Sequence, residues 1–318
     1  MPLYNSILET IGRTPIVKLN RMAPGHATVY VKVESFNPGG SVKDRLALSV
    51  ILDAEARGLL KPGDTICECT SGNVGIALAM VAAARGYKFV AVMSDCYSVE
   101  RRKLIRMYGG KVILSPGHEG SSGGNRLADK LAAKHGWFRA NQFQNPANPA
   151  YHRETTAAEI LSDFAGKRLD YFVTGFGTSG TLTGVGQMLK LARPDVNIIA
   201  TEPENAAVLA GNSWNLHQIQ GLAPDFIPDI LDKSVIDKLL TVDEISARDT
   251  ARRLAREEGI FVGISAGATL ATALRVAESA PEHSVLLAML PDTGERYLST
   301  FLFEGMNEGS DDEWLASL

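Results

Sequence analysis

The sequence has little of what marks several large classes of protein. Its three cysteines, Cys67, Cys69 and Cys96, are too few for a disulfide framework or a four-ligand metal site, and its six histidines show no metal-ligand spacing. The formal net charge of −4 gives no basic surface for nucleic acid. No apolar run reaches the roughly 18 residues of a membrane-spanning helix, and the N-terminus lacks a signal-peptide pattern. We therefore expect a cytoplasmic protein with no metal, membrane or nucleic-acid partner.

What the 318 residues do contain is an alternation of strand-like and helix-like patterns. This alternation is typical of parallel sheets with helices on both faces. The predicted strands are 29–34, 65–69, 88–93, 111–114, 171–174, 197–201 and 285–290. The predicted helices are 42–57, 75–85, 99–108, 126–134, 156–162, 181–191, 245–258 and 266–279.

A stretch rich in Asn and Pro, residues 140–149, interrupts this alternation near the midpoint. We place a boundary between two lobes there. The smaller lobe is predicted to comprise residues 36–147, and the larger lobe residues 1–35 and 148–318. The last stretch, 305–318, is acidic and has few apolar side chains, so its simplest interpretation is a frayed tail.

Lys43 is the candidate catalytic residue. It follows the strand predicted at 29–34 and a Pro-Gly-Gly loop, and it opens a predicted helix, so it should lie at the sheet edge where α/β folds bind ligands. A partly desolvated lysine amine can form a Schiff base with a carbonyl group. A lone lysine in a first helical turn is more often simply solvated, so the assignment depends on other loops at the same edge.

Three further loops have the composition of ligand-binding loops. Loop 70–75 places two glycines, two hydroxyls and the amide of Asn73 at a helix N-terminus, which suits a carboxylate, although the same residues are good N-caps. Loop 175–181 offers glycines and hydroxyls that suit a phosphate. In the third loop, Ser265 opens another helix, and a plain N-cap would explain it equally well.

Loop 175–181 also matches the dinucleotide fingerprint G-x-G-x-x-G, with Glu202 about 20 residues further along the chain. A nicotinamide-dependent dehydrogenase is therefore an alternative. Against it, the many hydroxyls favour a terminal phosphate monoester over a pyrophosphate. A dehydrogenase would also leave Lys43 and Asn73 without a role.

Five segments taken in order resemble the cysteine synthase (O-acetylserine sulfhydrylase) family of fold-type II pyridoxal-phosphate enzymes. The segments are 41–45, 70–75, 142–149, 177–181 and 294–300. The resemblance implies a two-lobed α/β fold, in which each lobe is an open, mostly parallel twisted sheet with helices on both faces. It also implies pyridoxal 5′-phosphate as cofactor and a homodimer, and it suggests the C-terminus of a serine acetyltransferase as a partner.

The resemblance assigns a role to each candidate residue. Lys43 resembles the Schiff-base lysine that also moves the Cα proton, Asn73 the residue that binds the cofactor 3′-oxygen, and Ser265 the partner of the pyridine nitrogen. The phosphate cup corresponds to Gly177, Thr178, Ser179, Gly180 and Thr181. The substrate-binding positions correspond to Thr70, Ser71, Gly72, Asn73, Gln142 and Gly221.

These roles imply a β-replacement transferase of cysteine biosynthesis. O-acetyl-L-serine would lose acetate to give an aminoacrylate intermediate, and sulfide would add at Cβ to give L-cysteine. A serine hydroxyl at the pyridine nitrogen makes the ring a weaker electron sink, which favours β-elimination over transamination. Gln220 stands where relatives that use O-phosphoserine have Arg, so the neutral acetyl ester is the expected donor.

Departures from the family pattern leave the nucleophile open. Val74 replaces the usual Thr of the asparagine loop, Tyr97 stands where Met is frequent, and Ala157-Ala158 replaces Gly-Pro. Tyr97 could narrow the site or change its preference for the nucleophile. A cystathionine β-synthase-type reaction, or β-replacement by another thiol or amine, therefore stays an alternative.

Overall fold

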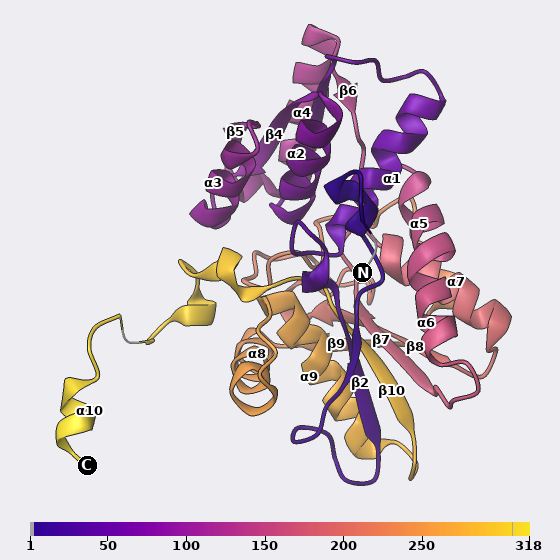
Figure 1. The fold of residues 1–318 in the computed structure, drawn as a ribbon, viewed down its shortest axis with the longest axis vertical. Helices are drawn as coiled ribbons and strands as arrows, with labels where there is room; N and C mark the ends of the chain where they lie inside the picture. The colour runs from indigo at the N-terminus through magenta and orange to yellow at the C-terminus, as the bar shows by residue number, and fades with distance from the viewer. Residues whose placement is uncertain (1–2, 307) are drawn as a thin grey trace.

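The computed structural model describes residues 3–306 and 308–318, and these residues form two separate sheets (Figure 1). The four-stranded sheet has the order β5-β4-β3-β6 and is parallel throughout. The six-stranded sheet has the order β1-β2-β10-β7-β8-β9 and is parallel except for the β1–β2 pair. The strands are β1 Ile16–Lys18, β2 Thr28–Val33, β3 Thr65–Cys69, β4 Lys88–Ser94, β5 Lys111–Ser115, β6 Phe138–Arg139, β7 Tyr171–Gly175, β8 Asn197–Pro203, β9 Lys238–Val242 and β10 Val285–Leu290.

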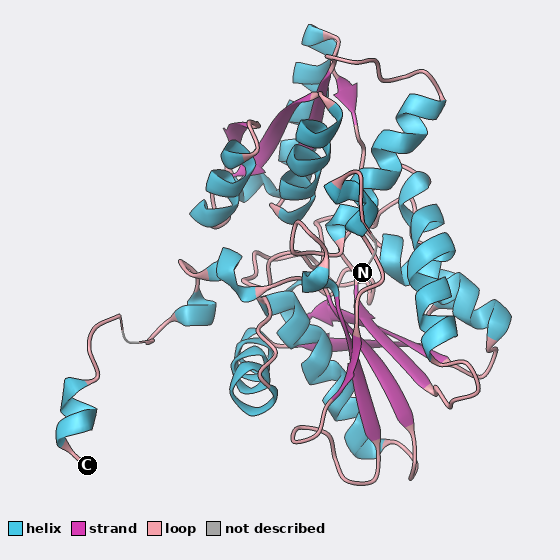
Figure 2. Cartoon of the chain, viewed as in Figure 1, coloured by secondary structure: helices cyan, strands magenta, loops and turns pink. Residues whose placement is uncertain are grey.

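Helices connect the strands and cover the sheets (Figure 2). Most crossovers between neighbouring parallel strands contain a helix, as parallel pairing requires. The predicted α/β class with mostly parallel sheets is confirmed. The helices are α1 Lys43–Ala56, α2 Asn73–Arg85, α3 Val99–Met107, α4 Gly120–His135, α5 Ala147–Tyr151, α6 Ala157–Asp163, α7 Gly180–Ala192, α8 Glu244–Glu258, α9 Ile264–Ser279 and α10 Asp312–Ala316.

Both faces of the four-stranded sheet are buried. On one face, Cys67 and Val92 pack with Ala128 of α4. On the other face, Ile66 and Ala91 belong to the core formed with α2. Successive residues of a strand point to opposite faces, so continuous apolar strands are what a sheet covered on both sides requires.

The six-stranded sheet is covered in the same way. Val29 and Leu286 lie in the core on the side of α8 and α9. Phe172 and Ile198 lie in the core that α6 and α7 form on the opposite face. The two sheets thus have separate cores, and the carboxyl ends of their strands face the region between them (Figure 1).

The sequence patterns did not predict β1, β6, β9, α5 or α10. β1 and β6 have only three and two residues, which is too short for a period to be recognised. α5 lies within the Asn- and Pro-rich stretch, where Pro149 falls in the first turn and removes no helical hydrogen bond. It packs against α1 and α7, and this tertiary packing makes it helical. The exact division into lobes stays a prediction.

A buried ion-pair cluster joins β2, α1 and α6. Arg45 Nε lies 2.8 Å from Glu34 Oε2, and its Nη1 lies 2.7 Å from Glu159 Oε1. Lys32 Nζ lies 2.8 Å from the other oxygen of Glu159. Arg45 is two residues beyond Lys43 on α1, so this cluster holds the beginning of that helix in place.

The end of the chain lies away from the sheets. α10 is separated from the rest of the protein in Figure 1, and Trp314 and Leu315 each expose 62% of their surface. None of the described helices is long and apolar enough to cross a membrane. Within the same residues, no three His, Cys, Asp or Glu side chains are grouped to hold a metal ion.

Candidate active site

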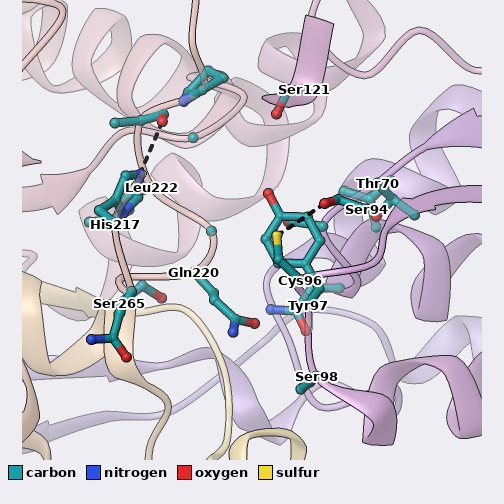
Figure 3. A pocket seen from close by; sticks show the side chains of 18 of the residues that line it. Thr70, Ser94, Cys96, Tyr97, Ser98, Ser121, His217, Gln220, Leu222 and Ser265 are labelled. Carbon is teal, nitrogen blue, oxygen red and sulfur yellow. Dashed lines mark hydrogen bonds between the residues drawn. The ribbon is translucent and has the colours of Figure 1, made fainter. Parts of the chain in front are cut away.

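A cavity of about 750 Å³ lies between the two sheets. Its walls come from the residues that follow the carboxyl ends of β3, β4, β7 and β10, which is where α/β sheets bind ligands. Figure 3 shows Gln220 and Ser265 on one side of the cavity, and Thr70 and Tyr97 on the other. Ten of the predicted site residues line it: Lys43, Thr70, Ser71, Asn73, Gln142, Gly177, Thr178, Thr181, Gly221 and Ser265.

Lys43 is the first residue of α1 and lines the cavity. Burial lowers the pKa of its ammonium to about 8, while the carboxylates of Asp292 and Glu34 act in the opposite direction. No described carboxylate forms an ion pair with it. At a pKa of about 8, roughly a tenth to a fifth of the amine is neutral between about pH 7 and 7.4, and the neutral amine is the form that a nucleophile or proton acceptor needs.

The preceding turn is shaped for this placement. Gly40 has a φ of +75°, and a Cβ there would lie 2.6 Å from Arg296 Nη2. The N–H of Gly39 donates to Asp44 Oδ2 at 2.6 Å. Only glycine satisfies both the backbone conformation and the space at position 40.

The asparagine loop is held by its own threonine. Thr70 Oγ1 accepts hydrogen bonds from the N–H groups of Gly72 at 2.9 Å and Gly75 at 3.0 Å. Gly72 has a φ of +140°, and a side chain there would collide with Arg101. Gly72 thus lies behind the cavity wall, where it allows Ser71 and Asn73 to face the cavity at the N-terminus of α2.

Gln142 lines the cavity, but its amide nitrogen already has partners. It donates to the carbonyl of Cys69 and, at 3.4 Å, to Glu68 Oε1. Glu68 is in turn held by Arg139 at 3.0 Å. Gln142 would have to exchange one of these partners in order to donate to a substrate carboxylate.

Loop Gly177–Thr181 joins β7 to α7, whose first turn contains no acidic residue. Ser179 has a φ of +73°, and its hydroxyl is buried without a partner in the described structure. Thr178 Oγ1 accepts from Asn148 Nδ2 at 3.1 Å. Ser179 and Gly180 lie just behind the residues that line the cavity, and the helix N-terminus favours an anion there.

His152 contacts the last residue of this loop, Thr181. Its Nε2 is 3.3 Å from the Thr181 hydroxyl, and its Nδ1 is 2.9 Å from Thr156 Oγ1. Burial lowers the pKa of His152 to about 3. The imidazole is therefore neutral, and it orients the Thr181 hydroxyl without adding a charge.

Ser265 lies across the cavity from the asparagine loop, in the first turn of α9. Gly221 adopts a φ of +101°, and a Cβ at that position would lie 4.0 Å from Ser265 Oγ. A neutral hydroxyl, rather than a carboxylate, therefore faces whatever binds at this wall.

Sequence reasoning did not assign the residues that surround Asn73. Asp292, Arg296 and Tyr297 come from the loop after β10, and Arg101 comes from α3. These positions are 28 to more than 200 residues away from Asn73, so no local pattern links them to it. Tyr97, Ser121 and Gln220 also line the cavity, and Ser121 faces the Tyr97 ring in Figure 3.

The comparison with protein families identifies the cofactor. The model of the family described as pyridoxal-phosphate dependent enzyme matches residues 7–292. This chain belongs to that family. The resemblance inferred from the loops is confirmed, pyridoxal phosphate is the cofactor, and the dehydrogenase alternative is not supported.

Two kinds of enzyme in this family, O-ureido-L-serine synthase and cysteine synthase, are similar to this chain over nearly its whole length. An O-ureido-L-serine synthase from Streptomyces lavendulae is 79% identical over 318 residues, which is all of this chain and 98% of the relative. A crystal structure of an O-ureido-L-serine-bound K43A mutant of O-ureido-L-serine synthase has a TM-score of 0.99 and 78% identity, covering 99% of this chain and 98% of the other. A cysteine synthase from Staphylococcus aureus is 47% identical over 94% of this chain and 97% of its own length.

The residues present fit pyridoxal phosphate. An amine with a lowered pKa is available for the aldehyde at Lys43. The unpartnered hydroxyl of Ser179 and the N-terminus of α7 suit a phosphate group. Ser265 and Asn73 line the walls between these two points.

Proposed function

We propose that this enzyme makes O-ureido-L-serine from O-acetyl-L-serine and hydroxyurea. The observation that carries the proposal is the 79% identity to an O-ureido-L-serine synthase over the whole chain. It is a β-replacement of the kind implied by the cysteine synthase resemblance, with a different nucleophile. Relatives at this level of identity share the family chemistry, and the nucleophile is the part that the departures from the family pattern leave open.

In the proposed reaction, one oxygen substituent on Cβ of the serine replaces another. The Cβ–O bond to the acetyl group breaks, and acetate leaves with the electron pair. A new Cβ–O bond forms to the hydroxyl oxygen of hydroxyurea, whose proton is released. The Cα proton is removed before acetate leaves and is returned after the new bond forms.

Lys43 is proposed to move that Cα proton. Its amine is neutral often enough at physiological pH to accept a proton, and Asp292 and Glu34 stabilise the ammonium that results. When bound, pyridoxal phosphate supplies the electron-withdrawing system that makes the Cα–H acidic. The solved structure of the relative's K43A mutant with O-ureido-L-serine bound supports a role for this lysine in turnover.

The residues in and beside the cavity are also proposed to bind the substrate carboxylate and the cofactor. The N–H groups at the start of α2, with Thr70 and Ser71, are proposed to bind the substrate carboxylate. Gly177–Thr181 is proposed to hold the phosphate, and Ser265 the pyridine nitrogen. Gln220 is neutral and already accepts a hydrogen bond from Arg101, so we expect O-acetylserine to be preferred over O-phosphoserine.

The wall near Tyr97 suits a neutral nucleophile with several polar atoms. Tyr97, Ser94, Ser98 and Ser121 all place hydroxyl-bearing side chains at the cavity. Burial raises the pKa of Tyr97, so its hydroxyl stays protonated and can donate to a urea carbonyl. Val74 adds an apolar surface beside the asparagine loop.

Sulfide is the second candidate, because a cysteine synthase shares 47% identity over almost the whole chain. The test offers the reconstituted enzyme O-acetyl-L-serine with hydroxyurea, sulfide or homocysteine at equal concentration, and measures kcat/KM for each product by mass spectrometry. We expect O-ureido-L-serine to form with hydroxyurea. Formation of L-cysteine or cystathionine without any O-ureido-L-serine would contradict the proposal.

Further proposals concern assembly and location. We propose a homodimer, and a serine acetyltransferase C-terminus as a carboxylate ligand for loop 70–73. Sedimentation and titration with a peptide carrying that C-terminus would test both. The cytoplasmic location stays a prediction.

A further inference from the structure

We infer that Asp292 is a positioning residue that fixes the side-chain amide of Asn73 as a hydrogen-bond donor toward the cofactor. The inference rests on the proposed role of Asn73 in cofactor binding. Asp292 lies two residues beyond the end of β10, is fully buried, and pairs through a β-bridge with Ser41 in the turn before Lys43. Asn73 is the first residue of α2, which follows β3 of the four-stranded sheet.

The two partners of the Asn73 amide allow only one orientation. Its Nδ2 donates to Asp292 Oδ2 at 2.7 Å, and its Oδ1 accepts from Arg296 Nη1 at 2.8 Å. A carboxylate can only accept hydrogen bonds, and a guanidinium can only donate them. If the amide rotated by half a turn, its oxygen would face the carboxylate of Asp292 and its NH2 group would face the guanidinium of Arg296. Neither pair could then form a hydrogen bond.

The frame around the amide is itself fixed. Tyr297 Oη donates to the same Asp292 oxygen at 2.6 Å. Arg296 Nη2 donates to the carbonyl of Gly39 at 2.8 Å, and the carbonyl of Arg296 accepts from Ser98 Oγ at 2.7 Å. The frame thus connects the loop after β10 with both the asparagine loop and the turn that carries Lys43.

Burial makes a purely stabilising role for Asp292 a poor explanation. Its second oxygen, Oδ1, is buried and has no partner among the described residues. An unsatisfied charged oxygen away from water is unfavourable for folding. The unfavourable burial of Asp292 is better explained by its hydrogen bond to the Asn73 amide and by its electrostatic effect on the amine of Lys43.

The consequence is a donor with a defined direction. One N–H of Asn73 is used by Asp292, and the second remains for the cavity that Asn73 lines. A donor that is already oriented needs no rearrangement when an oxygen anion binds. The phenolic 3′-oxygen of pyridoxal phosphate is such an oxygen, and a freely rotating amide would present its own oxygen there part of the time.

The test measures the dissociation constant of pyridoxal phosphate by titrating it into the apoenzyme, together with the visible absorbance of the reconstituted protein. We expect D292A to weaken binding at least tenfold and to shift the absorbance maximum. D292N keeps an acceptor oxygen for Asn73 and Tyr297, so it should recover most of the affinity. E202A is the matched control, since Glu202 is a buried carboxylate outside the cavity whose oxygens accept from Leu209 and Ala210 N–H groups.

A double-mutant comparison separates positioning from general stability. If Asp292 acts through Asn73, adding D292A to N73A should change the dissociation constant by less than twofold. Independent, multiplicative effects of the two substitutions would overturn the inference. So would a D292A protein with a lowered thermal midpoint but unchanged affinity and spectrum. If D292A does not fold, D292V takes its place in the same comparison, because it also removes both carboxylate oxygens but fills more of the buried volume, and the same outcomes decide. These measurements need no nucleophile, so a failure of the hydroxyurea assay leaves them interpretable.

Discussion

Replacing Lys43 with methionine should stabilise the apoenzyme at neutral pH. Burial lowers the pKa of this ammonium from 10.5 to about 8, so the folded protein holds the charge less favourably than the unfolded chain does. A displacement of this size corresponds to about 3 kcal/mol at pH 7. Lys43 is only partly buried beside an open cavity, and screening by water there reduces the expected effect to about 1–3 kcal/mol.

The direction of the pH dependence follows from proton binding. At pH 7 the lysine is mostly protonated in both states, and the folded wild type carries nearly the whole penalty. Between about pH 8 and 10.5 the unfolded chain binds more protons than the folded chain, so the stability of the wild type rises relative to the variant. The advantage of K43M should therefore fall by more than half from pH 7 to pH 9.5.

The assay is urea unfolding of the two apoproteins at both pH values, which cancels the titration of all groups they share. K103M is the matched control, because Lys103 is exposed on α3, and it should change stability by less than about 0.5 kcal/mol without a pH trend. An unchanged difference between wild type and K43M at the two pH values would refute the reasoning. So would a K43M apoprotein that is less stable at pH 7.

Three further predictions concern the phosphate loop, the buried ions and the tail. G177A places a methyl group against the carbonyl of Gly221, so cofactor affinity should fall at least tenfold, or about 1.4 kcal/mol, in a titration of the apoenzyme; unchanged affinity would show that the loop adapts. E34Q removes the charge that pairs with Arg45 in the core and should destabilise the protein by about 3 kcal/mol in urea unfolding, whereas a cost below 1 kcal/mol would contradict a tightly coupled cluster. Truncation after Gly305 should leave kcat/KM unchanged, because no described residue of the tail lines the cavity; a loss of activity would assign the tail a role in the active site or in its assembly.

The sequence by itself determined the fold class and the positions of most candidate residues. Strand-like and helix-like segments alternate along the chain, and each is recognised from its own local pattern of apolar residues, so this prediction needs no knowledge of the fold. The position of Lys43 after a Pro-Gly-Gly turn, and of loop Gly177–Thr181 after a buried strand, follows from neighbouring residues alone. The general rule that ligands bind at the carboxyl ends of parallel strands then placed both at one edge.

Only the tertiary structure decided how these residues are oriented. The amide of Asn73 is fixed by Asp292 and Arg296, which are more than 200 positions away, and the amide of Gln142 is turned toward the backbone of β3. The lowered pKa of Lys43 likewise comes from burial between two sheets. The amide orientations and the lowered pKa depend on contacts between segments that are far apart in the sequence. The periodicity of apolar residues along the chain carries no information about such contacts. The sequence therefore determines which chemical groups are available, whereas packing decides which of their atoms face the reaction.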